Sequence, residues 1–152
     1  MFGALTPLTV SNFKKNISDN IYRNSKFYKI IGYSNTKIIR GGIINNEKEE
    51  YILNNETIPL EIQLTNKKEP IYSREIDDPL EFKFLKNTFQ KGSISMVKIS
   101  KTKSSSTEFF ISTQKSAVLE GRYSVFGKVI NGFEILENLE SKDYLLKIEF
   151  NN

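Results

Sequence analysis

The stretch Phe109 to Val129, FFISTQKSAVLEGRYSVFGKV, decides how the rest of the chain can fold. It opens with an apolar run, Phe109 to Ile111, that predicts a buried strand. A polar loop leads to the turn residues Leu119 to Arg122. The segment from Tyr123 to Val129 is aromatic and β-branched, which predicts a second strand. On pattern alone these could be two strands of any β domain, because β propensity carries no chemistry.

Composition limits the chemistry that the chain can perform. Its 152 residues, 38% hydrophobic and 26% charged, predict a single globular domain over residues 1–152. The absence of Cys and His excludes disulfides, Ser-His-Asp triads and Cys/His zinc sites. A hard-cation site built from carboxylates stays open, but the sequence shows no calcium-loop spacing, so we expect no metal and no cofactor. The net charge of +4 is spread along the chain, so direct nucleic-acid binding is not expected.

Targeting segments are also absent from the pattern. The N-terminus lacks the basic and apolar regions of a signal peptide, and no apolar run approaches the length of a membrane span. We expect a cytoplasmic or nuclear protein without a membrane partner.

The literal residues of the opening stretch are more specific than its pattern. Glu108 to Ile111, followed by Leu119 to Val129, closely resembles the cyclophilins, which are β-barrel peptidyl-prolyl cis-trans isomerases. The family pattern is Gln-Phe-Phe-Ile, then Leu-Asp-Gly, a Lys or Arg, a His or Tyr, and Val-Phe-Gly-Lys-Val. This resemblance implies a mainly β fold, a closed eight-stranded antiparallel barrel capped by two short helices.

The N-terminal third fits the same family. Thr6-Pro7 and apolar spacing predict a helix from about Pro7 to Ser18, with Thr6 as its N-cap. Leu5 to Phe13 resembles the start of the first cyclophilin helix, although the strand that usually precedes it is almost absent. Ser25 to Tyr33 and Thr36 to Gly42 are predicted strands.

The C-terminal half continues the resemblance. Gly92 to Val97 resembles the Gly-x-Leu-Ser-Met-Ala strand of the family. The Ser- and Lys-rich stretch Lys98 to Ser106 is predicted to be a flexible loop. We expect a second capping helix from about Phe133 to Glu140 and a closing strand from Tyr144 to Phe150.

Residues 43–70 match the family least. The family has a Gly-rich loop here, yet no Gly lies between Gly42 and Gly92. We expect an atypical insertion at about 43–70, which carries a short extra hairpin. It is either a tolerated surface loop, since lengthening a loop costs little entropy, or an arm that binds a partner.

The resemblance also implies an active site. Prolyl isomerisation needs no nucleophile, because a protein lowers the barrier of about 18–20 kcal/mol by gripping proline and donating a hydrogen bond to the twisted amide. Lys29 stands where the family has its catalytic Arg, and Arg40 stands where it has a Gln. Lys lacks a planar guanidinium fork, which predicts weakened catalysis. Arg40 either supplies the missing guanidinium or repels Lys29 and blocks the pocket; alternatively, both cations are simply solvated.

The remaining site residues follow from the same alignment. The proline pocket is expected from four side chains: Ile38, Phe110, Leu119 and Tyr123. Lys98 replaces an Asn whose backbone binds the peptide, and Glu108 replaces a Gln and could hold either cation. Tyr28 stands where the family has a His.

Two functions therefore remain open from the sequence. The first is a divergent cyclophilin-type isomerase that binds Xaa-Pro segments of peptides or proteins, with weakened catalysis. The second is a non-catalytic cyclophilin-fold module that belongs to a larger assembly such as a ribonucleoprotein.

Overall fold

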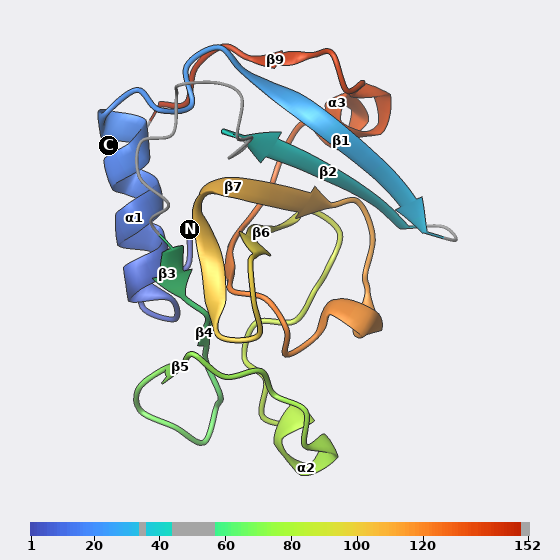
Figure 1. Ribbon diagram of the computed structural model, residues 1–152. Coiled ribbons are helices and arrows are strands. Elements are labelled where there is room, and N and C mark those ends of the chain that lie inside the picture. The colour runs from blue at the N-terminus through green and yellow to red at the C-terminus, as the bar shows by residue number, and fades with distance from the viewer. Residues whose placement is uncertain (34–35, 44–56, 150–152) are drawn as a thin grey trace.

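The computed structural model describes residues 1–33, 36–43 and 57–149, apart from the side chains of residues 29–31, 33 and 36. Seven strands form the main sheet: β1 (Ser25–Tyr33), β2 (Thr36–Gly42), β3 (Thr57–Pro59), β6 (Ser93–Lys98), β7 (Lys103–Ser112), β8 (Val125–Lys128) and β9 (Tyr144–Leu145). Their order is β8-β6-β7-β2-β1-β9, with β3 paired to β7 (Figure 1). The pairs in this sheet are antiparallel.

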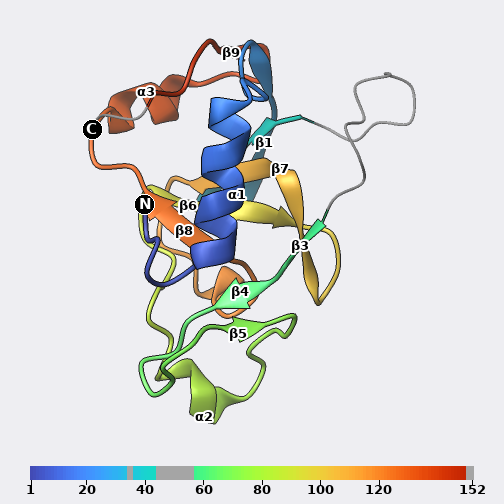
Figure 2. The same cartoon turned by 90° about the vertical axis from the view of Figure 1, so that its left-hand side faces the viewer.

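The other elements lie around this sheet. They are the helices α1 (Pro7–Ser18), α2 (Pro79–Phe82) and α3 (Phe133–Asn138), a 3-10 turn at Ala117–Leu119, and a small sheet of β4 (Glu61–Ile62) and β5 (Ile71–Tyr72). In Figure 2, α1 runs across the strands, and β4, β5 and α2 lie together at the far end from β9 and α3.

Three elements predicted from local sequence have the expected bounds. The N-terminal helix spans Pro7–Ser18, and the first two strands span Ser25–Tyr33 and Thr36–Gly42. Apolar spacing places Val10 and Phe13 on the buried face of α1, where they enter the core.

The N-cap of α1 differs from the expectation. Thr6 occupies the N-cap position, but its side chain makes no capping hydrogen bond. The carboxylate of Glu61, which is fully buried in β4, accepts hydrogen bonds from the backbone N–H groups of Leu8 and Thr9 at 3.1 and 2.9 Å. The Thr9 hydroxyl donates to the same carboxylate at 2.7 Å. A negative charge from a distant strand therefore satisfies the free N–H groups at the start of the helix.

The main core lies between α1 and the sheet. Phe13 contacts the rings of Tyr22, Phe109 and Phe126 at centroid distances of 5.0, 5.7 and 4.8 Å. Residues from β1, β2 and β6 complete this cluster, so the helix covers one face of the sheet. A separate apolar cluster of Leu60, Ile62, Leu64 and Ile76 lies under α2 and the small sheet.

The expected closed, eight-stranded barrel with two short caps is not confirmed. Among the described residues the main sheet has seven strands and stays open between β8 and β9. A closed barrel needs a continuous ladder around its circumference. Here β9 forms only two residue pairs with β1, and the backbone of β8 accepts one hydrogen bond from Phe2, at 2.8 Å. The first helix also differs in its placement, since α1 packs against one face of the sheet.

The predicted loop at Lys98 to Ser106 is wrong in its second half. β7 begins at Lys103, and Ser104, Ser105 and Ser106 are buried. Small side chains suit this place because β3 and α1 both pack closely here: Ser105 pairs with Thr57, and Asn12 and Asn16 donate to the Ser106 carbonyl at 2.6 Å each. Tertiary contacts thus override a composition typical of loops.

Two other predicted elements are shorter than expected. The closing strand is reduced to Tyr144–Leu145, and the second capping helix ends at Asn138. Of the expected insertion at 43–70, residues 44–56 lie outside the described residues. The part from residue 57 onward contributes β3, which pairs with β7, and β4, which pairs with β5.

Candidate active site

Strand β7 sends neighbouring side chains to opposite faces of the sheet. Phe109 and Ile111 enter the main core with α1, whereas Phe110 joins a separate cluster with Phe89 and Val97. This follows from the two-residue period of a strand. Phe110 therefore sits on the face that α1 does not cover.

A cavity of about 160 Å³ opens beside Phe110. Its described lining consists of Ile38, Arg40, Val97, Lys98, Phe110, Leu119 and Tyr123. An apolar cavity of about 150 Å³ can hold a benzene ring, so this one is large enough for the five-membered ring of proline. The cavity is apolar at its base and carries two cations at its edge.

Two aromatic rings, Phe110 and Tyr123, line the cavity, and a third, Phe89, packs behind them. Phe110 stacks on Phe89 at 5.9 Å with an interplanar angle of 4°, and Tyr123 meets Phe110 edge-on at 5.1 Å. Tyr123 is also edge-on to Phe89, at 6.1 Å. Phe89 is almost fully buried, at 1% exposed, and fixes the orientation of Phe110 from behind. Sequence reasoning missed Phe89, since it lies alone in a polar stretch without strand or helix periodicity.

The structure brings most of the predicted site residues together. Ile38, Arg40, Lys98, Phe110, Leu119 and Tyr123 line the same cavity. Glu108 lies next to it and contacts Arg40. The backbone of Lys29 pairs with that of Arg40 across β1 and β2, but the Lys29 side chain lies outside the described part of the structure.

Arg40 is held in place by a carboxylate and a phenol. Its Nη2 lies 3.1 Å from Oε2 of Glu108, and the Tyr28 hydroxyl donates to the same oxygen at 3.0 Å. The guanidinium carbon also stands 5.7 Å from the centre of the Tyr28 ring. Burial and the Glu108 carboxylate raise the pKa of Tyr28, which keeps the phenol protonated and able to donate. Among the described residues, the buried Nε of Arg40 has no hydrogen-bond acceptor.

A second ion pair flanks the cavity on its other side. Lys98, at the end of β6, contacts the carboxylate of Glu75, and its amine lies 5.3 Å from the centre of the Tyr123 ring. Glu75 comes from the segment between β5 and α2. The same segment is tied to the turn below the cavity, because the Ile76 N–H donates to the Gly121 carbonyl at 2.9 Å. Sequence reasoning did not identify Glu75, which reaches Lys98 only through the tertiary fold.

A buried carboxyl group supports the aromatic base. Oε1 of Glu120 accepts a hydrogen bond from the Phe89 N–H at 3.0 Å, while its buried Oε2 has no partner among the described residues. Burial raises the pKa of Glu120, and the bond from Phe89 and the charge of Lys115 offset part of this effect. Glu120 therefore positions Phe89, and through it Phe110.

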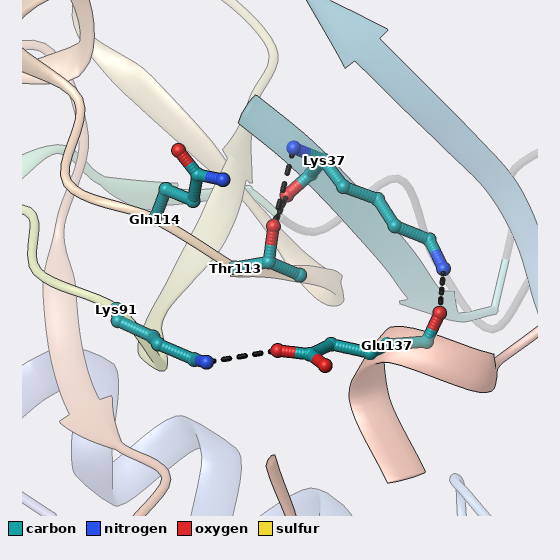
Figure 3. A pocket seen from close by; sticks show the side chains of 5 residues that line it. All are labelled: Lys37, Lys91, Thr113, Gln114 and Glu137. Carbon is teal, nitrogen blue, oxygen red and sulfur yellow. Dashed lines mark hydrogen bonds and ion pairs between the residues drawn. The ribbon is translucent and has the colours of Figure 1, made fainter. Parts of the chain in front are cut away.

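A larger cavity of about 440 Å³ lies elsewhere, between α3 and the end of β7 (Figure 3). Four of its five described lining residues, Lys37, Lys91, Thr113 and Glu137, bind one another. Lys37 donates to the carbonyls of Leu136, Glu137 and Leu139 at 3.4, 2.9 and 3.2 Å, where it caps the end of α3. Lys91 pairs with the Glu137 carboxylate at 2.9 Å and lowers its pKa. This cavity thus lacks the apolar base and edge donors found beside Phe110.

The described part of the chain lacks two further features. It contains no cluster of three or more acidic side chains arranged to hold a metal ion. None of its helices combines the length and apolar character needed to span a bilayer.

Comparison with known families decides where this chain belongs. The sequence model described as "Cyclophilin type peptidyl-prolyl cis-trans isomerase/CLD" matches residues 1–148. The chain is a member of the cyclophilin family. Curated cyclophilin relatives include a peptidyl-prolyl cis-trans isomerase of Acinetobacter baylyi, 24% identical over 144 residues, and peptidyl-prolyl cis-trans isomerase A of Dickeya dadantii, 26% identical over 139 residues.

These relatives are longer than the region of similarity. The matches take in 91% and 88% of this chain but 63% and 60% of the relatives. The chain thus spans less than two thirds of the length of either bacterial protein.

Solved cyclophilin structures share the fold. A cyclophilin-type isomerase of Cryptosporidium parvum matches with a TM-score of 0.58 and 26% identity, covering 91% of this chain and 73% of that one. A structure of it determined in the presence of the dipeptide Ala-Pro has a TM-score of 0.57 and 27% identity, covering 95% and 82%. A cyclophilin of Hirschia baltica is similar in fold alone, with a TM-score of 0.61 and 16% identity over 95% and 66% of the two chains.

Proposed function

We propose that this cyclophilin binds Xaa-Pro segments in the cavity beside Phe110 and catalyses their cis-trans isomerisation with reduced efficiency. The observation that carries the proposal is the cavity itself, in which Phe110, Leu119 and Ile38 form an apolar base next to the guanidinium of Arg40. Family membership supports the same reaction, and the Cryptosporidium parvum relative was solved with a proline dipeptide present.

Arg40 is the group we propose as hydrogen-bond donor to the twisted amide. It lines the cavity directly opposite Phe110 in the sheet, and Glu108 and Tyr28 fix its orientation. A fixed donor stabilises a transition state without having to reorganise, and one such donor is typically worth about 2.7–4 kcal/mol. Lys29, whose backbone lies opposite Arg40, is a second cation that could assist.

Reduced efficiency follows from the position of the guanidinium. Arg40 belongs to β2, whereas the place of the family's catalytic Arg is on the neighbouring strand β1 and is taken by Lys29. We therefore expect Lys29→Arg to raise kcat/KM by roughly ten- to a hundredfold, since it restores a planar donor at that place. Arg40→Gln should lower kcat/KM by about 10²–10³ if Arg40 is the donor in the wild type.

The test is NMR exchange spectroscopy on a proline tetrapeptide such as Ala-Ala-Pro-Phe, which reports cis-trans exchange without a coupling protease. Wild type should accelerate exchange, and Phe110→Ala should abolish the effect while circular dichroism confirms folding. Equal rates for wild type and Arg40→Gln would show that the donor is assigned wrongly, and Lys29→Ala is then the next variant.

The alternative proposal is a non-catalytic interaction module, as expected for a component of a larger assembly such as a ribonucleoprotein. It is favoured by the engagement of Arg40 with Glu108, which neutralises the proposed donor. A folded wild type that binds the tetrapeptide, seen as shifts at Tyr123, but leaves the exchange rate at its uncatalysed value would establish this alternative.

A further inference from the structure

The two cations beside the cavity are the outer members of their ion pairs. The Arg40 side chain is 25% exposed, and its partner Glu108 is 11% exposed. Lys98 is likewise 25% exposed, above Glu75 at 8%. The carboxylates thus lie beneath, and the cavity edge presents N–H donors and positive charge. Of the seven described residues that line the cavity, two are cations and none is acidic.

The cations stand on opposite sides of Phe110. Arg40 is on β2 and Lys98 is on β6, and the sheet order places β7, with Phe110, between these strands. Glu108 and Tyr28 fix the first cation, whereas Glu75 and the ring of Tyr123 fix the second. A proline ring resting on Phe110 would therefore have a positively charged donor on each side.

A neighbouring cation increases the positive potential. The exposed side chain of Arg122 precedes Tyr123 in the turn below the cavity. An anion in the cavity would lie closer to the cations at its edge than to the carboxylates beneath them, so attraction would exceed repulsion.

We propose that this site selects proline segments with an anionic side chain, a carboxylate or a phosphate, directly beside the proline. The proposal rests on the function proposed above, in which the cavity holds the proline. Arg40 and Lys98 are then the specificity-determining residues. One of them pairs with an anion that precedes the proline, and the other pairs with an anion that follows it. A carboxylate and a phosphate share the property that matters here, which is a negative charge within reach of these two donors.

The test compares matched tetrapeptides by NMR exchange spectroscopy, with each catalysed rate divided by the uncatalysed rate of the same peptide. Pairs carry Glu or Gln, and phosphoserine or serine, before the proline; a second set carries them after it. An exposed ion pair changes an equilibrium by up to about fivefold, so we expect the anionic member of a pair to react about two- to fivefold faster. The advantage should shrink between about 0.01 M and 1 M salt, as the screening length falls from about 30 to 3 Å.

Variants of the Lys98 pair give the second readout. Lys98→Gln alone would leave Glu75 buried without its partner, so the double variant Glu75→Gln/Lys98→Gln removes both charges together. The ratio of Glu to Gln rates should fall in the double variant and rise in Glu75→Gln, which leaves Lys98 unneutralised. Lys101→Gln is the matched control, because it removes an exposed lysine from the same hairpin without touching the cavity.

The outcomes separate this proposal from the previous one. If the neutral peptides are turned over and the Glu and Gln peptides react at equal rates, the specificity is overturned and the isomerase function stays intact. A faster rate for the Glu peptide that does not change with salt concentration would have the same meaning. A folded protein that neither binds nor turns over any of the peptides would overturn the proposed function and the specificity with it. A faster rate found only for the phosphoserine peptides, or only for the Glu peptides, supports the proposal and identifies which anion the site recognises.

Discussion

The contact between Glu61 and α1 is the feature whose removal has the clearest expected cost. Two backbone N–H groups and the Thr9 hydroxyl all donate to this buried carboxylate, at 2.7 to 3.1 Å. In Glu61→Gln, one carboxylate oxygen becomes an NH₂ group that cannot accept. Whichever way the amide is turned, at least one of the three donors faces another donor and is left unsatisfied.

The expected loss is about 3 kcal/mol of the free energy of unfolding. A hydrogen bond to a charged group contributes about 1.5–3 kcal/mol, and a negative charge at a helix N-terminus up to about 2 kcal/mol. Desolvation of the Glu61 carboxylate offsets part of this sum. A loss of 1 kcal/mol lowers Tm by about 2–4 °C for a protein of this size, so Tm should fall by roughly 6–12 °C.

Urea unfolding followed by circular dichroism measures this change. Glu69→Gln, an exposed site in the segment between β4 and β5, is the matched control and should change stability by less than about 0.5 kcal/mol. A double-mutant cycle with Thr9→Val should give an interaction energy different from zero, since the two side chains contact each other. If Glu61→Gln costs no more than the control, the carboxylate does not cap α1 and the reasoning fails.

Two further predictions concern stability around the site. Burial raises the pKa of Glu120 in the folded state, so the folded protein is stabilised while this carboxyl is protonated. The free energy of unfolding should therefore fall as pH rises from the unfolded pKa of about 4.3 to the higher folded value. Urea titrations at several pH values should show the stability of Glu120→Gln rising relative to wild type over this window, and a constant difference would contradict the assignment. Gly42 has φ +102°, and an added Cβ would lie 2.2 Å from the Thr107 carbonyl oxygen, so Gly42→Ala should cost roughly 3 kcal/mol or more in the same assay. Gly32→Ala, where an added Cβ meets nothing within 4 Å, should cost less than about 1 kcal/mol, and similar losses for both would refute the steric argument.

Local sequence determined the elements whose stability depends on neighbours in the chain. The helix Pro7–Ser18 and the strands Ser25–Tyr33 and Thr36–Gly42 have the predicted bounds, because apolar periodicity and a proline at the first turn act over a few residues. The stretch from Phe109 onward also fixed the family. The resemblance placed Phe110, Leu119 and Tyr123 in one pocket, and the three side chains line the same cavity.

Tertiary structure alone decided the parts that depend on distant residues. Glu61 caps a helix 52 residues away, Glu75 pairs with Lys98, and Phe89 supports Phe110, and no local pattern predicts these partners. The Ser-rich start of β7 is buried because β3 and α1 cover it, against its loop-like composition. Charge pairing, ring stacking and strand pairing act through space, so the sequence shows which groups are available but not which partners they meet.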